Sequence, residues 1–179
     1  MEIQSIYQQA LLFAAGKHTE QHQTIPGTDL PYVVHLSNVA MELLIANAHT
    51  PDFDLGFAIQ LALLHDTLED TNTTFEELET TFEWRVAQGV AALTKNKALP
   101  KEQRMQESLN RIKALSKEVW TTKLADRITN LQEPPKHWDQ HKRTAYMQEA
   151  AVILAQLTGA NSYLEQRLQQ KIRAYQQYL

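Results

Sequence analysis

The chain has 179 residues and a mass of 20.5 kDa, a size that fits one folded domain and excludes a large multidomain enzyme. Hydrophobic residues make up 43% and charged residues 21%, with five Gly and six Pro, as in an ordinary soluble globular protein. Cys is absent, which excludes disulfides, thiolate nucleophiles and zinc fingers and favours a cytoplasmic location. We therefore expect one domain that spans residues 1–179.

Neither a membrane span nor a secretory signal is expected. The longest apolar runs, Ala10–Ala15 and Ala150–Ala155, have six residues each, whereas a transmembrane helix needs about 20. The first residues include Glu2 and no early Lys or Arg, so the basic segment of a secretory signal is missing.

The net charge of −4 conceals an uneven distribution of charge along the chain. Residues 18–84 include twelve acidic side chains and no Lys or Arg, whereas residues 85–179 include sixteen basic and eight acidic side chains. Because there is no overall basic excess, a dedicated nucleic-acid-binding function is disfavoured. A fold that faces the acidic half with the basic half would suit a cation on one wall of a cleft and phosphates on the other.

Apolar residues recur with helical spacing along nearly the whole chain and no segment alternates like a strand, so we expect an all-α fold. Gly16 is suited to end the first helix, Thr74 opens a capping box, and Asn161 is suited to cap the last helix. The polar stretch 94–101 is expected to be a loop. The predicted helices cover residues 3–16, about 31–48, 55–67, a segment that begins at Thr74, 102–116, 118–132, 140–158 and 161–177.

The segment Leu55–Thr67 is apolar on almost all sides, which predicts a buried central helix. It leads directly into four polar residues, His65, Asp66, Glu69 and Asp70. Three carboxylates at a helix C-terminus repel one another and oppose the helix dipole, and no Lys or Arg is near in sequence. A bound divalent cation would offset this charge, and basic residues from the second half of the chain are the alternative.

Two further polar residues, His35 and Asp126, fall on predicted core helices. A lone His of this kind is most often a structural core residue, and Asp126 with Arg127 is ordinarily a surface ion pair. Together with His65 and Asp66, however, they form a set of two imidazoles and two carboxylates from three helices. Such mixed nitrogen and oxygen ligation suits Mn²⁺, Fe²⁺ or, less well, Mg²⁺, and it leaves coordination positions for water and a substrate oxygen. This pattern indicates a phosphohydrolase.

Three sequence blocks carry this polar set: PYVVH at 31–35, ALLHDTLEDT at 62–71 and KLADRITNL at 123–131. In their order and spacing they resemble the HD-domain hydrolases of the RelA/SpoT type, and most closely the small single-domain members that cleave the alarmone (p)ppGpp. The second block is the most specific, because it has the extended HDxxEDT form that many other HD enzymes lack. The resemblance covers the chain from about Ala10 to Tyr163.

The resemblance implies an all-α hydrolase, a single HD-domain helical bundle, that binds Mn²⁺, with Fe²⁺, Mg²⁺ and Zn²⁺ as alternatives. Glu69 and Asp70 would be catalytic carboxylates beside the attacking water, and Asn130 would contact the nucleotide. The chain leaves no room for the synthetase domain of the long bifunctional relatives, so only hydrolysis is expected. The implied metal ligands are His35, His65, Asp66 and Asp126.

One segment departs from the family pattern. Relatives typically carry an Arg/Lys pair shortly before the Pro-Tyr block, where it meets substrate phosphates, but residues 21–28 here read QHQTIPGT and include no permanent cation. The compensating charges would have to come from the basic half of the chain. By resemblance Lys97, Lys142 and Tyr146 match positions that line the nucleotide pocket, although a solvated surface position is the ordinary alternative for each Lys.

The leading hypothesis is metal-dependent hydrolysis of the 3′-pyrophosphate of (p)ppGpp, or of a close analogue such as an adenosine alarmone. The missing basic pair favours a second hypothesis, an HD phosphohydrolase that acts on another nucleotide or on a dinucleotide. A third is a helical interaction module with a vestigial site, which the complete ligand set disfavours. Both enzymatic hypotheses predict a small nucleotide as the partner, rather than nucleic acid or a membrane.

Overall fold

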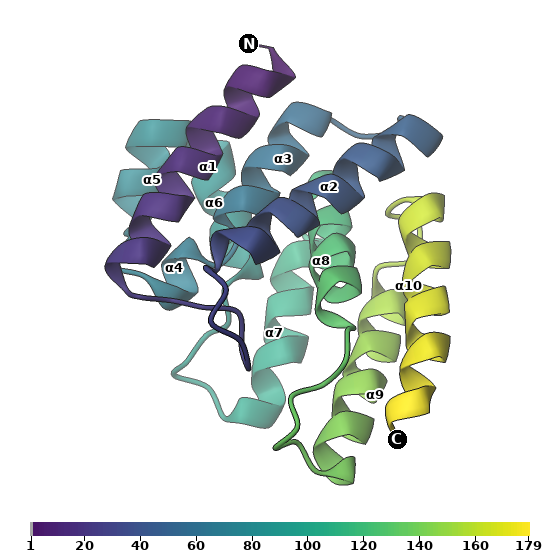
Figure 1. Ribbon diagram of the computed structural model, residues 1–179. Helices are drawn as coiled ribbons and strands as arrows, with labels where there is room; N and C mark the ends of the chain where they lie inside the picture. The colour runs from purple at the N-terminus through teal and green to yellow at the C-terminus, as the bar shows by residue number, and fades with distance from the viewer. Residues whose placement is uncertain (1) are drawn as a thin grey trace.

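The computed structural model describes residues 2–179, which form a bundle of α-helices (Figure 1). The only strand-like pairing among these residues is an isolated antiparallel bridge between Thr24 and Pro31, so the all-α prediction is confirmed. No helix within this described range is both long and apolar enough to cross a membrane. The elements are α1 (Ile3–Glu20), α2 (Val33–His49), α3 (Leu55–Leu64), α4 (Thr67–Asp70), α5 (Phe75–Phe82), α6 (Trp84–Leu93), α7 (Lys101–Lys113), α8 (Lys117–Asn130), α9 (Gln140–Gln156), α10 (Ser162–Tyr175) and the short 3-10 helix η1 (Gln176–Tyr178).

Helix α3 lies at the centre of the bundle because it is apolar on nearly every side. Eight of its ten residues are buried, and the side chains of Ile59, Leu61 and Leu64 are fully inaccessible. Burial of one such side chain stabilises the fold by about 1.5–3 kcal/mol. Helices α1, α2 and α8 pack around α3 (Figure 1). The C-terminal end of α3, which leads into His65, is therefore held by packing against three helices.

The polar segment after α3 forms a corner, whereas the sequence predicted one helix over 55–67. Helix α3 ends at Leu64, and a separate short helix, α4, begins at Thr67. At this helix end, side chains contact the backbone carbonyls in place of backbone N–H groups: Thr67 Oγ1 donates to the Leu64 carbonyl at 2.7 Å, and His65 Nδ1 lies 2.8 Å from the Ala62 carbonyl. His65 and Asp66 therefore lie at the turn between two helices.

Helix α1 continues to Glu20, four residues beyond the predicted end at Gly16. The buried face of this helix includes Ala10, Ala14 and His18, which lie one turn apart. The packed face therefore continues past the glycine to the buried His18, although Gly inside a helix costs about 1 kcal/mol relative to Ala.

The helix that begins after Thr74 ends at Phe82, and a second helix follows at once. Thr74 caps α5 as predicted, since its hydroxyl accepts the Glu77 N–H at 3.2 Å. Glu83 has φ 80°, which breaks the helical path between α5 and α6. The sequence gives no signal for this break, because Glu rarely adopts positive φ. Asn161 caps α10 as predicted by accepting the Leu164 N–H at 3.1 Å.

The connection between α1 and α2 folds into a compact loop. It turns at Gly27, whose φ of 83° favours glycine, and the Ile25 N–H donates to the Leu30 carbonyl at 2.9 Å. The Tyr32 N–H donates to the Gln23 carbonyl at 3.2 Å. These bonds fix Tyr32 at the start of α2, one turn before His35.

Candidate metal centre and active site

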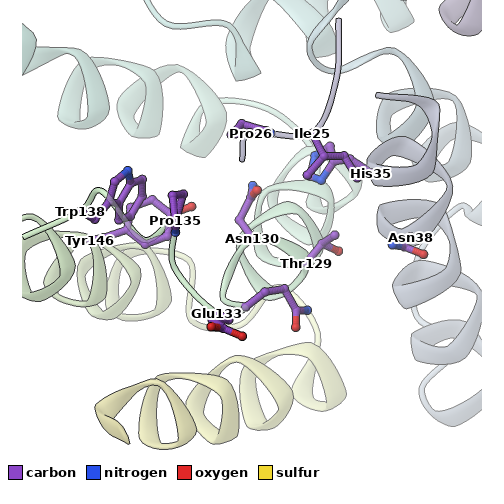
Figure 2. Close-up of a pocket in the computed structure, with 11 residues that line it drawn as sticks. Ile25, Pro26, His35, Asn38, Thr129, Asn130, Glu133, Pro135, Trp138 and Tyr146 are labelled. Atoms are coloured by element: carbon purple, nitrogen blue, oxygen red, sulfur yellow. The ribbon is translucent and has the colours of Figure 1, made fainter. Parts of the chain in front are cut away.

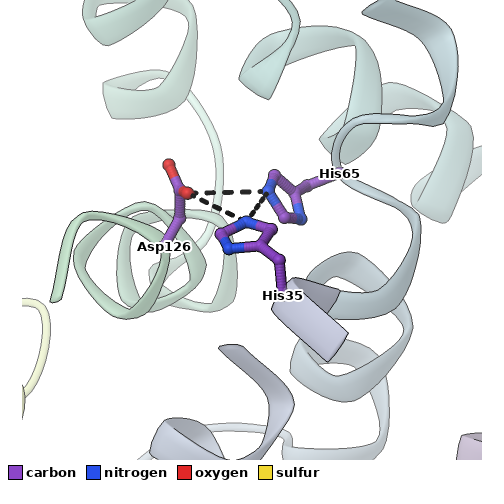
Figure 3. Close-up of side chains that lie close together, drawn as sticks. All are labelled: His35, His65 and Asp126. Carbon is purple, nitrogen blue, oxygen red and sulfur yellow. Dashed lines mark hydrogen bonds and ion pairs between the residues drawn. The ribbon is translucent and has the colours of Figure 1, made fainter. Parts of the chain in front are cut away.

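Three helical segments bring two imidazoles and a carboxylate together in the interior (Figure 3). The Nε2 atoms of His35 on α2 and His65 after α3 lie 3.4 Å apart. Asp126 Oδ1 on α8 lies 3.5 Å from the first of these nitrogens and 3.6 Å from the second. All three residues are nearly inaccessible, with 4–6% of their surface exposed. A nitrogen and oxygen donor set that converges in this way fits a divalent cation.

Asp66, the fourth predicted ligand, borders this group. Its Oδ2 atom lies 2.9 Å from His65 Nε2 and 3.9 Å from His35 Nε2. The same oxygen accepts a hydrogen bond from the Tyr32 hydroxyl. Tyr32 thereby holds the carboxylate on the side of the two imidazoles, and all four predicted ligands lie in one place.

The contact of His65 with the backbone suits its predicted role. Its Nδ1 atom lies 2.8 Å from the Ala62 carbonyl, which can only accept a hydrogen bond, so this nitrogen carries the proton. In the neutral imidazole the lone pair of Nε2 is then available to a metal ion, which would displace the proton that the neighbouring carboxylates favour on this nitrogen. Metal-binding His residues in proteins are commonly oriented by such a hydrogen bond at the other ring nitrogen.

The charges of the site are strongly coupled. Burial disfavours the charged form of His65, but the neighbouring Asp66 and Asp126 outweigh burial and raise the pKa of His65 well above its ordinary value. Burial likewise disfavours the Asp126 carboxylate, but Lys123 and the two imidazoles hold its pKa well below the ordinary value. The pKa of Asp66 is also lowered, mainly by His65, although burial opposes this shift. Both carboxylates are therefore ionised and able to ligate a cation.

Two α8 side chains orient Asp126. The buried Lys123 ammonium lies 3.0 Å from Asp126 Oδ2, and the Asn130 side-chain amide donates to Oδ1. Lys123 precedes Asp126 by three residues and Asn130 follows it by four, so all three lie along one helix face. This face directs the carboxylate toward the imidazole pair.

A polar pocket of about 170 Å³ opens beside His65 and Asp66. The α4 residues Glu69 and Asp70 line it, so the predicted catalytic carboxylates lie next to the predicted metal ligands. Burial, together with the negative charges of Asp66 and Glu69, raises the pKa of Asp70. Three basic residues, Lys95, Lys123 and Arg127, also line this pocket. The acidic and basic parts of the chain thus meet over one site.

A second pocket of about 250 Å³ adjoins the first. Figure 2 shows Trp138 and Tyr146 at one end, Ile25 and His35 at the other, and Asn130 between them. Apolar and aromatic side chains share its lining with polar ones, and the lining includes one carboxylate, Glu133, and no Lys or Arg, in contrast to the charged first pocket. We call this second pocket the aromatic pocket, after Trp138 and Tyr146. Asn130 and Tyr146 line both pockets, which places them at the junction.

The four predicted substrate-binding residues differ in their positions. Asn130 and Tyr146 lie at the junction of the pockets. Lys97 is exposed, and its ammonium donates to the Glu69 backbone carbonyl at 2.6 Å. Lys142 is exposed, lies 5.0 Å from the centre of the Trp138 ring and lines neither of these two pockets. Substrate binding by all four stays a prediction.

Sequence reasoning assigned no role to several residues that the structure places at the site. Tyr32 lies in the PYVVH block and Lys123 stands one turn before Asp126, so their positions in the blocks were available as signals. Trp138 and Lys95 lie in loops outside the three blocks. Only the folded chain brings those two to the pockets.

Comparison with known proteins identifies the class to which this fold and site belong. Residues 10–162 match the HD domain family. The chain therefore belongs to the HD-domain family, as the three sequence blocks predicted, and the implied HD-domain fold is confirmed.

Several similar proteins narrow the class. The zebrafish (Danio rerio) guanosine-3′,5′-bis(diphosphate) 3′-pyrophosphohydrolase MESH1 is 38% identical over 163 residues, which cover 88% of this chain and 87% of that protein. The human (Homo sapiens) protein of the same name is 37% identical over 161 residues and 87% of each chain. The solved structure of a metazoan ortholog of SpoT that hydrolyzes ppGpp aligns with a TM-score of 0.82 and 30% identity over 97% of both chains.

Proposed function

We propose that the protein hydrolyses (p)ppGpp, or a closely related alarmone, at the 3′-pyrophosphate and releases pyrophosphate together with GDP or GTP. One observation carries this proposal: the buried group of His35, His65 and Asp126 borders a pocket that combines carboxylates with cations. The relatives named for this activity match the chain over nearly its whole length.

The residues favour a divalent cation as the cofactor, and we propose Mn²⁺. His35, His65, Asp66 and Asp126 would hold it through two imidazole nitrogens and two carboxylate oxygens. This mixed donor set suits Mn²⁺ or Fe²⁺ better than Mg²⁺, which prefers oxygen. When bound, such a cation supplies Lewis acidity that favours the attack of water on a phosphoryl group.

The α4 carboxylates divide the proton chemistry between them. Glu69 is fixed, because its Oε2 atom accepts the Lys95 backbone N–H at 3.0 Å, and this suits it to orient the attacking water. Asp70, with its raised pKa, is better suited to carry the proton at neutral pH. Asn130 and Tyr146 would contact the nucleotide at the junction of the pockets.

The cations needed for the phosphates would come from the second half of the chain. Residues 21–28 offer none, but Lys95, whose side chain is 41% exposed, lines the pocket beside the metal ligands. Electrostatic attraction of a pyrophosphate group to the Lys95 ammonium, and to the positive charges of the buried and paired Lys123 and Arg127 that also line this pocket, supports substrate binding without the Arg/Lys pair.

A second candidate function follows from the loop between α1 and α2. Residues 21–28 of this loop include no permanent cation, and Ile25 and Pro26 line the aromatic pocket. An apolar wall at this position favours an HD phosphohydrolase that acts on another nucleotide or on a dinucleotide.

Metal-dependent product analysis tests the proposal. The purified protein is stripped with a chelator, reloaded separately with Mn²⁺, Mg²⁺, Fe²⁺ or Zn²⁺, and incubated with ppGpp, its adenosine analogue, common nucleotides and dinucleotides. We expect pyrophosphate from ppGpp with Mn²⁺, and no turnover by the Asp66→Ala variant. Orthophosphate from a different substrate would support the second candidate, and failure of every metal and substrate combination would contradict an enzymatic function.

A further inference from the structure

Arg127 is a buried cation next to the predicted metal ligand Asp126. Only 4% of the surface of Arg127 is exposed. It is the next residue after Asp126 on α8. A buried guanidinium is costly unless nearby groups compensate its charge. The groups that compensate this charge are therefore the ones that Arg127 holds in place.

Both compensating groups are on α9. The Arg127 guanidinium pairs with Glu149, and its central carbon lies 4.5 Å from the centre of the Tyr146 ring. Tyr146 and Glu149 are three residues apart, so they lie on one face of α9. The Nε and Nη1 atoms of Arg127 are buried and have no hydrogen-bond partner within residues 2–179. If α9 shifted, the buried charge would lose its ion pair and its aromatic partner together.

Tyr146 links Arg127 to the two pockets. It lines both the charged pocket and the aromatic pocket, and its ring meets that of Trp138 edge to face at 5.0 Å between centroids. Arg127 is itself buried and paired, so it acts on a ligand mainly through the position of this ring.

We propose that Arg127 is a positioning residue that couples the metal-ligand helix α8 to α9 and fixes Tyr146 as the shared wall of the two pockets. The expected effect on catalysis rests on the proposed function, in which a nucleotide spans both pockets. The proposed effect on the Tyr146 ring does not depend on activity.

The kinetic test compares substitutions of Arg127 and Tyr146 in the full-length, Mn²⁺-loaded protein with ppGpp as substrate. Arg127→Met should raise KM about tenfold, equivalent to about 1.4 kcal/mol, with little change in kcat. Arg127→Lys keeps a cation over the ring and should recover most of this loss. Adding Tyr146→Ala to Arg127→Met should raise KM little further, because both changes remove the same contact.

Two further variants serve as an alternative test and as a control. Glu149→Gln removes the charge of the half-buried partner and should raise KM in the same direction if Arg127→Met fails to fold. Arg167→Met removes an Arg that pairs with Glu42 at 3.2 Å between α10 and α2, away from both pockets, and should leave KM unchanged.

Trp138 fluorescence tests the proposal without relying on turnover. In protein whose other two Trp residues are replaced, as Trp84→Phe and Trp120→Phe, Arg127→Met should change the Trp138 emission as Tyr146→Ala does, and Arg167→Met should not. If ppGpp is not a substrate but the emission changes in this way, the proposed function fails and the positioning role stands. Independent, multiplicative effects of Arg127→Met and Tyr146→Ala on KM, or an Arg127→Met protein with unchanged Trp138 emission, would overturn it.

Discussion

The carboxylate of Glu69 accepts a hydrogen bond from the backbone N–H of Lys95 at 3.0 Å. A second bond joins the same two segments, because the Lys97 ammonium donates to the Glu69 carbonyl at 2.6 Å. Helix α4 and the loop before α7 are thus tied together at the edge of the charged pocket. This loop fixes Oε2 of Glu69, while Oε1 lies 3.9 Å from the Lys95 ammonium on the same pocket wall.

This contact makes Glu69→Gln an informative substitution. The Gln side-chain oxygen can still accept the Lys95 N–H, so the loop should stay in place, but the negative charge beside the attacking water is lost. We expect kcat to fall about 10²–10⁴-fold, the usual contribution of a general acid or base. Mn²⁺ binding, measured by calorimetry, should be nearly unchanged.

The neighbouring carboxylate provides the comparison. Asp70→Asn should also lower kcat, and if Asp70 carries the proton it should flatten the pH profile of kcat more than Glu69→Gln does. Full activity of the Glu69→Gln protein would show that Glu69 has no role in the reaction.

Metal removal should lower thermal stability. A cation that binds only the folded protein stabilises it by about 2.7 kcal/mol at one hundred times its Kd, which for a chain of this length raises Tm by about 5–10 °C. Melting curves of chelator-treated protein with and without added Mn²⁺ measure this shift. Asp126→Ala should abolish the shift, because it removes a buried ligand and leaves the two imidazoles without their shared carboxylate.

An exposed acidic residue gives the matched control for that experiment. Glu79→Ala removes a carboxylate from the surface of α5 and should leave the Mn²⁺-dependent shift in Tm intact. If Mn²⁺ still raised the Tm of the Asp126→Ala protein by about 5–10 °C, as we expect for the wild type, the metal would bind at another site.

Tyr32 should contribute to metal affinity although it is not a predicted ligand. Its hydroxyl donates to Asp66 Oδ2 and holds this carboxylate beside the imidazoles. Loss of such an orienting bond typically weakens metal binding about 10–100-fold. Tyr32→Phe should therefore raise the Kd for Mn²⁺ in a calorimetric titration while the secondary structure measured by circular dichroism stays the same. An unchanged Kd would mean that Asp66 needs no such support.

The fold was predictable from sequence wherever apolar spacing decides it. The unbroken apolar surface of α3 predicts its central position, and side chains at Thr74 and Asn161 predict two helix starts. The break at Glu83 and the corner at His65 were not predictable, because the first needs an unusual φ and the second depends on side chains that capture backbone carbonyls. Tertiary contacts decide both.

The candidate site was predictable where a residue type carries the chemistry. Two imidazoles and two carboxylates in apolar surroundings suggest a metal, and the structure brings His35, His65, Asp66 and Asp126 together. Residues that act by position gave no such signal. The contact of Arg127 with Tyr146, for example, depends on how α8 and α9 pack, and the spacing of residues within either helix does not reveal it.

Glu118 provides a test of stability that is separate from the site. This residue is 8% exposed at the start of α8, where it accepts the Asp54 N–H at 2.9 Å and a hydrogen bond from the Ser116 hydroxyl. Burial works against the carboxylate, but these bonds and the nearby Arg85 together lower the pKa of Glu118 below its ordinary 4.5. Its ionised form therefore stabilises the folded chain.

The sign of the pH dependence follows from this lowered pKa. Above about pH 4.5 the carboxylate is ionised in both the folded and the unfolded chain and its full contribution is present; as the pH falls through the lowered pKa of the folded state, the contribution is lost. Glu118→Gln should therefore reduce the free energy of unfolding by about 1–2 kcal/mol at pH 7 and by less at pH 3. Urea unfolding at both pH values measures the difference, with the exposed Glu79→Gln as the control. A loss of the same size at pH 3 and pH 7 would show that packing, rather than the charge of Glu118, stabilises this corner.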